Sequence, residues 1–381
     1  MFYLVIFIFL LLCSLGQYYS RSKTEIQLSN VFFYTIIFML IIVGGFRFET
    51  GGDWPGYKAL YDQTDTRAIE PLFKGVINLS KLIGNYQWIF VFCEIIRFTT
   101  MAIFLERNSY YDKKYKILFI LLYYVMYWFY YDLVIIRQST AAAIFSFGLL
   151  KENKIGFKKY CLYVLLAIGF HFSSVILFFA YPFFYKVSKK TMGILSLVIV
   201  LLYLAGLDVF STLLTTILSF LPKSNYLVYR LWAYTQISAL ATARRLTGQT
   251  LVYLLIFFIM IYRELILKKD EKTLFFNGTC TFILLFFGFP SLSTISTRIA
   301  SNFSIFVIFI IISIINSYRK TIFIPIVLVT LCFCFNKGVF FEGPDKVAYN
   351  PYQFYWTHQI FNLPSDGLER LNSTPNYDKG K

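Results

Sequence analysis

His171 is the residue of this chain best suited to proton transfer. It is one of only two histidines, and it lies inside an apolar block that reads AIGFHFSS over residues 167–174. Imidazole has a reference pKa of about 6.5, so it can accept a proton near neutral pH. Ionisable groups inside membrane segments are candidates for function. The alternative is a neutral histidine bonded to a backbone carbonyl where a helix breaks.

A glycine-rich loop over residues 44–57 supplies two further candidates. It reads GGFRFETGGDWPGY and contains five glycines. Glycine lets a backbone turn tightly and approach a ligand closely, so Arg47 and Asp53 are plausible ligand contacts. The alternative is an ordinary turn-rich loop with an internal ion pair.

Glu70 precedes Pro71 and opens an amphipathic stretch that reaches Asn85. Proline at the first helical position and a carboxylate near the positive end of a helix both favour a helix start, which gives Glu70 a structural explanation. The other possibility is that Glu70 is a catalytic or sugar-binding carboxylate.

Arg137 stands at the start of an apolar block rich in alanine and serine, in the sequence DLVIIRQSTAAA over residues 132–143. A cation at a helix N-terminus is unfavourable for the helix dipole, and a bound anion would relieve this. The alternatives are a salt bridge between Asp132 and Arg137, or an arginine whose head reaches water along an apolar stem. Arg298, just before the block 299–316, is a further candidate anion contact.

The elements that carry these residues are long apolar segments. The 381 residues are 58% hydrophobic and 15% charged, against about 25% charged in soluble domains. A helix crosses a bilayer with about 20 apolar residues, and backbone in lipid must satisfy its own hydrogen bonds. We therefore predict an all-α, polytopic integral membrane bundle of about 10–12 transmembrane helices. The apolar blocks cover residues 1–19, 29–46, 87–105, 116–131, 138–150, 160–185, 191–206, 209–221, 249–267, 273–289, 299–316 and 321–336.

Loop charge sets the predicted orientation. Loops 106–116 and 151–159 have an excess of lysine and arginine, as cytoplasmic loops do. Counting spans then places three segments on the outer side. The first is the long loop 47–86, whose five basic and five acidic residues cancel in charge. The others are 222–248 and the tail from residue 337.

The segment 222–248 departs from this charge rule. It contains Lys223, Arg230, Arg244 and Arg245 and no acidic residue, yet the count puts it outside. A cationic segment on the outer side suggests an anionic ligand such as a diphosphate. The alternative is a miscounted span, since the positive-inside rule is a bias.

Two blocks leave their topology open. If 160–185 is one span, Lys186 and its neighbours fall outside, whereas a broken or re-entrant segment around Gly169 places them inside. The block 209–221 could lie flat on the membrane surface. We expect one transmembrane domain over 1–361, followed by a polar, disordered tail over 362–381.

Several classes of protein are excluded by composition. The formal net charge of +16 does not indicate nucleic-acid binding, because the basic residues stand in short loops between spans. The six cysteines lie in apolar blocks without a metal-ligand spacing to histidine. We therefore predict no metal site, no cofactor and no disulfide framework.

The order of the polar motifs resembles the EpsG-like family, whose members include Wzy-type polymerases of O-antigen, capsule and exopolysaccharide repeat units. The motifs in chain order are Arg47, Gly51-Gly52-Asp53 with Tyr57, Glu70-Pro71, Arg137-Gln138, His171-Phe172-Ser173-Ser174, Arg298 and Asn350-Pro351-Tyr352.

The resemblance implies a GT-C-like membrane glycosyltransferase of the bacterial inner (cytoplasmic) membrane, with its active site on the periplasmic or outer side. Such an enzyme would transfer a growing glycan from undecaprenyl diphosphate to the non-reducing end of a new lipid-linked repeat unit. A regulator of chain length is a possible protein partner.

The same resemblance suggests roles for the motif residues. The acceptor hydroxyl needs a base, for which His171 is the first choice and Asp53 or Glu70 the second. Guanidinium groups bind phosphate bidentately and can stabilise charge that grows on a leaving diphosphate. The expected substrate and diphosphate contacts are Arg47, Tyr57, Arg137, Gln138, Arg244, Arg245 and Arg298. These residues and His171 should line one cavity that opens away from the cytosol.

Three other functions compete with this reading. A lipid-linked oligosaccharide flippase or transporter would need charges along several spans, whereas the ionisable groups here gather near the predicted outer ends. A membrane O-acyltransferase could use His171 as its base. An O-antigen ligase would share the donor chemistry but transfer to a different acceptor.

Overall fold

The chain is helical throughout the part that its computed structural model describes, and the only extended pairing there is an isolated bridge between Arg47 and Phe354. This confirms the predicted all-α class. The described residues are 1–63, 69–107, 113–150, 155–222, 228, 229, 232, 235, 246–265, 267, 272–318, 327, 328, 330, 331, 334–336 and 346–373.

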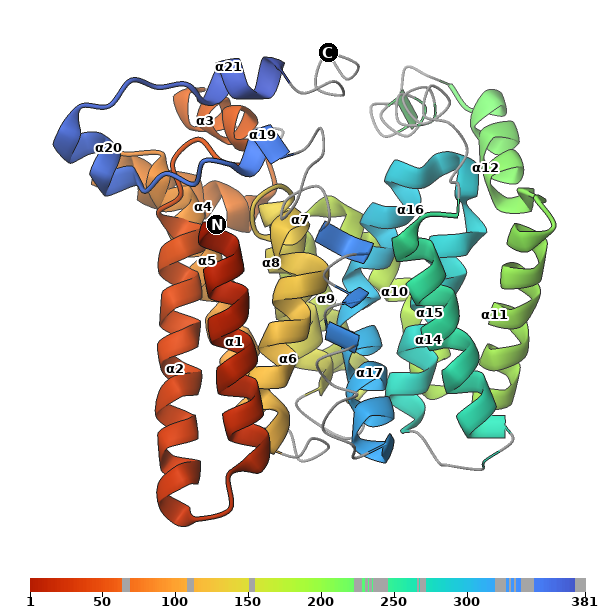
Figure 1. Cartoon of the computed structure of the whole chain (residues 1–381). Coiled ribbons are helices and arrows are strands. Elements are labelled where there is room, and N and C mark those ends of the chain that lie inside the picture. Colours follow the sequence, from red (N-terminus) through yellow and green to blue (C-terminus); the bar gives the residue numbers. More distant parts are fainter. Residues whose placement is uncertain are drawn as a thin grey trace. The chain divides into compact units, whose positions relative to one another are not determined.

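The chain divides into two compact units. Unit 1 comprises Met1–Val175 with Lys320–Lys381, and unit 2 comprises Ile176–Arg319. The helices of unit 1 are α1 (Phe2–Tyr19), α2 (Lys23–Gly45), α3 (Trp54–Asp62), α4 (Pro71–Ile83), α5 (Gln87–Arg107), α6 (Lys116–Tyr123), α7 (Phe129–Tyr131), α8 (Ile136–Leu150), α9 (Phe157–Phe170), α19 (Lys346–Tyr349), α20 (Tyr355–Phe361) and α21 (Gly367–Asn372) (Figure 1).

Unit 2 is built from α15 and the helices around it. Helix α15 packs against α10, α11, α14, α16 and α17, and α12 bends by 87° from α11 after Gly206, whose φ is +74°. The helices of unit 2 are α10 (Leu177–Tyr185), α11 (Lys189–Leu204), α12 (Val209–Phe220), α14 (Gly248–Leu265), α15 (Thr273–Gly288), α16 (Ser293–Ala300) and α17 (Ser304–Tyr318).

Within the described residues, four helices are long and apolar enough to cross a membrane, or five if the bent pair α11–α12 is one span. The four are Phe2–Tyr19, Lys23–Gly45, Gln87–Arg107 and Ile295–Ser317. The protein is therefore a polytopic membrane protein. The count is lower than the predicted 10–12 partly because blocks such as 138–150 and 160–185 form shorter helices, and partly because most of 321–336 lies outside the described residues.

Helix α5 forms the centre of unit 1, where it packs against α2, α4 and α8. Glycines allow the close approach of α2, since a Cβ on Gly44 would lie 2.5 Å from the Glu94 carboxylate and one on Gly45 would lie 3.0 Å from the Val91 Cα. Helix α8 packs in turn against α9, and α9 against α4. The starts of α4 and α8 and the end of α9 are thereby brought into one region.

The apolar block 160–185 is broken. Helix α9 ends at Phe170, His171 has an extended backbone with φ −155° and ψ 121°, and a 3-10 turn over Phe172–Ile176 precedes α10. The structure therefore has a helix break within this block, just after Gly169. The interruption places His171 at a helix end, where its side chain can turn toward other elements.

The C-terminal segment 346–373 folds back onto the loop after α2. The Phe48 N–H donates to the Gln353 carbonyl at 2.9 Å, and the Glu49 carboxylate accepts from the Ser365 hydroxyl at 2.6 Å and the Gly367 N–H at 3.0 Å. The sequence predicts a disordered tail from residue 362, whereas residues 362–373 are described here and include α21. The buried Glu49 carboxylate explains this order, because burying it requires hydrogen-bond donors.

Candidate active site

Three ionisable side chains from three helix ends meet in unit 1. Arg137 Nη1 donates to Glu70 Oε2 at 2.9 Å, and His171 Nδ1 lies 3.3 Å from Glu70 Oε1. The Phe172 N–H donates to the same Oε1 at 3.2 Å. The side chains are 14% exposed for Glu70, 16% for His171 and 28% for Arg137. We call Glu70, Arg137, His171 and the neighbouring Tyr57 the Glu70 cluster.

Local sequence places Glu70 beside His171. Pro71 is the first residue of α4, which fixes the helix start and leaves Glu70 as the residue just before it. A Cβ on Gly169 would lie 2.7 Å from Leu72 Cδ1, so glycine at this position allows α4 to approach the end of α9. The sequence reading of Glu70 as a helix-start residue is therefore compatible with its place in the cluster.

The environment keeps the Glu70 carboxylate ionised. Burial by itself raises the pKa of Glu70, but the hydrogen bond from His171 and the positive charge of Arg137 outweigh it and lower the pKa to about 2. Tyr57 keeps its proton for the opposite reason, since burial raises its pKa to about 12 although Arg137 acts to lower it. The Tyr57 hydroxyl is thus a donor, and it donates to the Val134 carbonyl at 3.2 Å.

This arrangement has the parts of a proton-transfer site next to a cation. A carboxylate beside Nδ1 fixes the orientation of the imidazole ring and leaves Nε2 as its proton-accepting atom, as in hydrolase triads. The Arg137 guanidinium keeps its charge at any physiological pH and is partly exposed. The cluster can therefore accept a proton and stabilise an anion in the same place.

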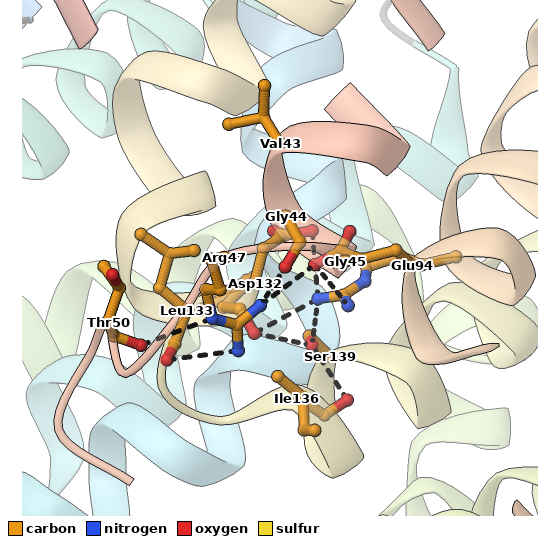
Figure 2. Close-up of polar contacts among 12 residues, drawn as sticks. Val43, Gly44, Gly45, Arg47, Thr50, Glu94, Asp132, Leu133, Ile136 and Ser139 are labelled. Atoms are coloured by element: carbon orange, nitrogen blue, oxygen red, sulfur yellow. Dashed lines mark hydrogen bonds and ion pairs between the residues drawn. The ribbon is translucent and has the colours of Figure 1, made fainter. Parts of the chain in front are cut away.

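A second group of charges lies fully inside unit 1. Arg97 contacts Glu94 Oε1 at 3.2 Å and Asp132 Oδ1 at 3.0 Å, and Arg47 lies 3.7 Å from the same Glu94 oxygen (Figure 2). Each of these four side chains is at most 1% exposed. We call them the buried network. Their two positive and two negative formal charges cancel, which is how a protein can hold ions away from water.

The buried network also fixes the turn between α7 and α8. Arg97 Nη1 donates to the Tyr131 carbonyl at 3.2 Å and to the Ser139 hydroxyl at 2.7 Å, while Arg47 Nη2 donates to the Leu133 carbonyl at 3.5 Å. Figure 2 shows Arg47, Leu133 and Ser139 gathered around this turn. Because the turn runs directly into α8, the network also supports the position of Arg137, which stands in the first turn of α8 and belongs to the Glu70 cluster.

The structure brings some of the predicted site residues together and separates others. Arg47 is 1% exposed and belongs to the buried network, so it is not part of the Glu70 cluster. Gln138 is 2% exposed. Asp53 is the residue before α3. The predicted alternative of an Asp132–Arg137 salt bridge is wrong, because Asp132 pairs with Arg97 and Arg137 with Glu70.

Three predicted residues lie outside the described part of unit 1. Arg298 is in α16 of unit 2, and Arg244 and Arg245 lie outside the described residues. The second histidine, His358, is stacked on Phe48 within the C-terminal segment. In the described part of the chain, no three His, Cys, Asp or Glu side chains are grouped so that they could hold a metal ion.

Sequence reasoning did not single out Glu94 and Arg97. Both stand inside the apolar block 87–105, three residues apart on α5. Charged residues within a membrane segment are costly unless they pair, and opposite charges three apart share one helix face. That spacing was the available signal for a buried ion pair.

The fold and the two charged groups define a polytopic helical membrane protein with a polar, partly open site at helix ends. A family model for the EpsG family matches residues 30–354, which is most of the chain. The chain therefore belongs to the EpsG family, and this membership indicates a membrane protein related to polysaccharide synthesis. Neither the curated proteins nor the solved structures contain a match to it.

Proposed function

We propose that this protein is a polysaccharide repeat-unit polymerase, a membrane glycosyltransferase of the Wzy type. It transfers the growing glycan from undecaprenyl diphosphate to the non-reducing end of a new lipid-linked repeat unit. The proposal rests on EpsG family membership and on one observation, the contact of Glu70 with both Arg137 and His171. It places the protein in the bacterial inner membrane with this site on the outer side.

The reaction requires one bond to form and one to break. The acceptor hydroxyl oxygen bonds to the anomeric carbon of the glycan, and the bond from that carbon to the diphosphate oxygen breaks. The electron pair of the broken bond leaves with undecaprenyl diphosphate, and the acceptor proton goes to a base. A catalyst therefore needs a proton acceptor on one side of the anomeric carbon and positive charge on the other.

His171 supplies the proton acceptor in this proposal. Its Nδ1 edge faces the Glu70 carboxylate at 3.3 Å, so Nε2 takes the proton and the ionised carboxylate stabilises the imidazolium that forms. Glu70 is then a positioning residue rather than the base. General-base catalysis contributes about 100- to 10,000-fold to rate.

Arg137 supplies the positive charge. Its side chain is 28% exposed, more than those of Glu70 and His171. Arg137 also stands in the first turn of α8, where backbone N–H groups favour an anion. Its guanidinium can bind two diphosphate oxygens as the leaving group gains charge. Arg47 is left out of the proposed substrate contacts because it is enclosed.

A complementation experiment tests the proposal. A strain without the gene should attach single repeat units to its surface acceptor and make no long chains, and the wild-type gene should restore the ladder of chain lengths. We expect Arg137→Ala and His171→Ala to leave only single units while the proteins still fold. Arg21→Ala is the matched control, because Arg21 is an exposed arginine in the turn between α1 and α2.

The products separate the competing functions. Lipid-linked units that accumulate on the inner side of the membrane would indicate a flippase. Full-length chains that remain on the lipid carrier would indicate a ligase, and chains of normal length that lack acyl groups would indicate an acyltransferase. Unchanged chain length in the deletion strain would remove the polymerase proposal.

A further inference from the structure

Helix α4 presents three different faces. Successive residues of a helix turn by about 100°, and the side of α4 that packs on the bundle holds buried Phe73, Val76, Ile77 and Ser80. A second side is apolar but uncovered. Its exposed residues are Leu72 at 39%, Leu79 at 51%, Leu82 at 84% and Ile83 at 50%.

The third side of α4 is polar. Lys74, Asn78 and Lys81 lie there, and this side borders the apolar side at Leu82, four residues after Asn78. A helix with one apolar side, one basic side and one packed side suits the boundary between lipid chains and water. Lysine stems can reach along apolar surface while the ammonium stays at the phosphate level.

Helix α20 adds exposed apolar residues beside the end of α4. Trp356 is 45% exposed, Ile360 72% and Phe361 69%. The Asn85 side-chain amide donates to the Tyr355 hydroxyl and thereby ties the residue just after α4 and Gly84 to the first residue of α20. Tryptophan is enriched at membrane interfaces, and tryptophan and phenylalanine are typical of the apolar face of a helix that lies in one.

These apolar residues continue the surface of a membrane span. Helix α2 is long and apolar enough to cross a bilayer and ends at Gly45. The next residue, Phe46, stacks on Trp356 with ring centroids 4.0 Å apart, and its carbonyl accepts from the Tyr355 N–H at 2.8 Å. In Figure 1, α4 and α20 lie together at this end of α2. They therefore stand where α2 leaves the lipid.

We propose that α4 and α20 form a rim that inserts its exposed apolar side chains among the acyl chains of one leaflet. The rim consists of Leu79, Leu82, Ile83, Trp356, Ile360 and Phe361. Its occupant is the bilayer itself, because the rim is continuous with a span that the bilayer already surrounds.

The rim has a consequence for the site, which rests on the proposed function. Glu70 is the residue before α4, so a helix that lies in the interface holds the Glu70 cluster at the level of lipid headgroups. The diphosphate of a lipid-linked donor lies at that level. Such a donor reaches Arg137 by moving sideways within the leaflet, without leaving the membrane.

Photo-crosslinking in liposomes tests the rim directly. The full-length protein carries p-benzoylphenylalanine at Leu82 or Ile360, in vesicles of phosphatidylethanolamine and phosphatidylglycerol. Leu368 is the matched control, because it is 52% exposed on α21, which Figure 1 shows farther from the end of α2. We expect phospholipid adducts at Leu82 and Ile360, at least ten times as many as at Leu368. Equal adducts at all three positions, or crosslinks to a second copy of the chain instead, would overturn the rim.

A second measurement separates the rim from the polymerase proposal. Leu82→Ser with Ile360→Ser should slow transfer from a donor with an undecaprenyl chain about tenfold and leave transfer from a short-chain, water-soluble donor unchanged. Equal slowing with both donors would contradict a membrane role for the rim. If the wild-type protein transfers from neither donor, the polymerase proposal fails. The lipid adducts then still test whether the rim inserts into the bilayer.

Discussion

The buried network and the Glu70 cluster are made of similar residues and differ in what surrounds them. Glu94 and Arg97 are at most 1% exposed and meet charges of opposite sign inside the helix bundle. Glu70 and Arg137 are 14% and 28% exposed and meet a histidine at a helix break. An enclosed and balanced set of charges supports the fold, whereas a partly open set beside a titratable imidazole is available for chemistry.

Glu94→Ala should show the largest difference in folding stability between the buried network and the Glu70 cluster. It leaves Arg47 and Arg97 buried with a single carboxylate between them, and removing one partner of a buried ion pair costs about 3–5 kcal/mol. We expect a large drop in the thermal unfolding midpoint of the detergent-solubilised protein. Glu70→Ala is the comparison and should cost about 1 kcal/mol or less, because its pair is partly exposed. Equal losses would show that the two groups do not differ in this way.

Gly51→Ala should be the next largest effect. Gly51 has a φ of +92°, and a Cβ there would lie 2.1 Å from the Leu133 carbonyl oxygen, which also accepts from Arg47. Backbone strain alone costs about 1–3 kcal/mol, before any clash is relieved. Gly52→Ala is the matched control, since its Cβ would meet nothing within 4 Å. Unfolding midpoints that fall equally for both variants would contradict the close packing of this loop on the turn.

Tyr57→Phe tests the link between the two groups. The hydroxyl donates to the Val134 carbonyl in the turn that the buried network also holds, and Arg137 is within hydrogen-bond reach of the same hydroxyl. Loss of one such hydrogen bond costs about 0.5–1.5 kcal/mol. Denaturant unfolding should show this loss for Tyr57→Phe and almost none for Tyr61→Phe on the same helix. No difference between the two variants would argue against the link.

The smallest effect should come from pH. Glu70 has a pKa of about 2 in the folded protein, below its usual 4.5, so its ionised form stabilises the fold above pH 4.5 and this contribution is lost as the pH falls toward 2. The stability difference between wild type and Glu70→Gln should therefore shrink as the pH falls from about 4.5 toward 2. A difference that disappears already near pH 6 would contradict the ion pair with Arg137.

The helices and part of the site follow from sequence because they depend on local properties. The long apolar blocks predict both ends of α1 and α5 and the end of α2 closely, since crossing a bilayer requires length and apolar character. The start of α2 is missed because its first turn, from Lys23, is polar. Glu70, Arg137 and His171 are recognisable because each stands at an interruption of an apolar or amphipathic segment. Interruptions mark helix ends, and helix ends are where polar side chains can gather.

The pairing of charges depends on how helices pack, which sequence does not show. Asp132 stands five residues before Arg137, yet it pairs with Arg97 on α5. Arg47 follows a pair of glycines as a ligand-binding arginine would, but those glycines let α2 approach Glu94 so closely that Arg47 is enclosed. The docking of residues 362–373 depends on contacts with Glu49, more than 300 residues earlier in the chain.

Transfer by the purified protein tests the central claim most directly. Wild-type protein in liposomes is given a synthetic undecaprenyl-diphosphate repeat unit, and the products are separated by length; Glu70→Gln is compared at equal amounts of folded protein. We predict polymer from the wild type, and at least a 100-fold slower reaction from Glu70→Gln with nearly the same unfolding midpoint. Polymer formation by Glu70→Gln at the wild-type rate would contradict a catalytic role for the cluster.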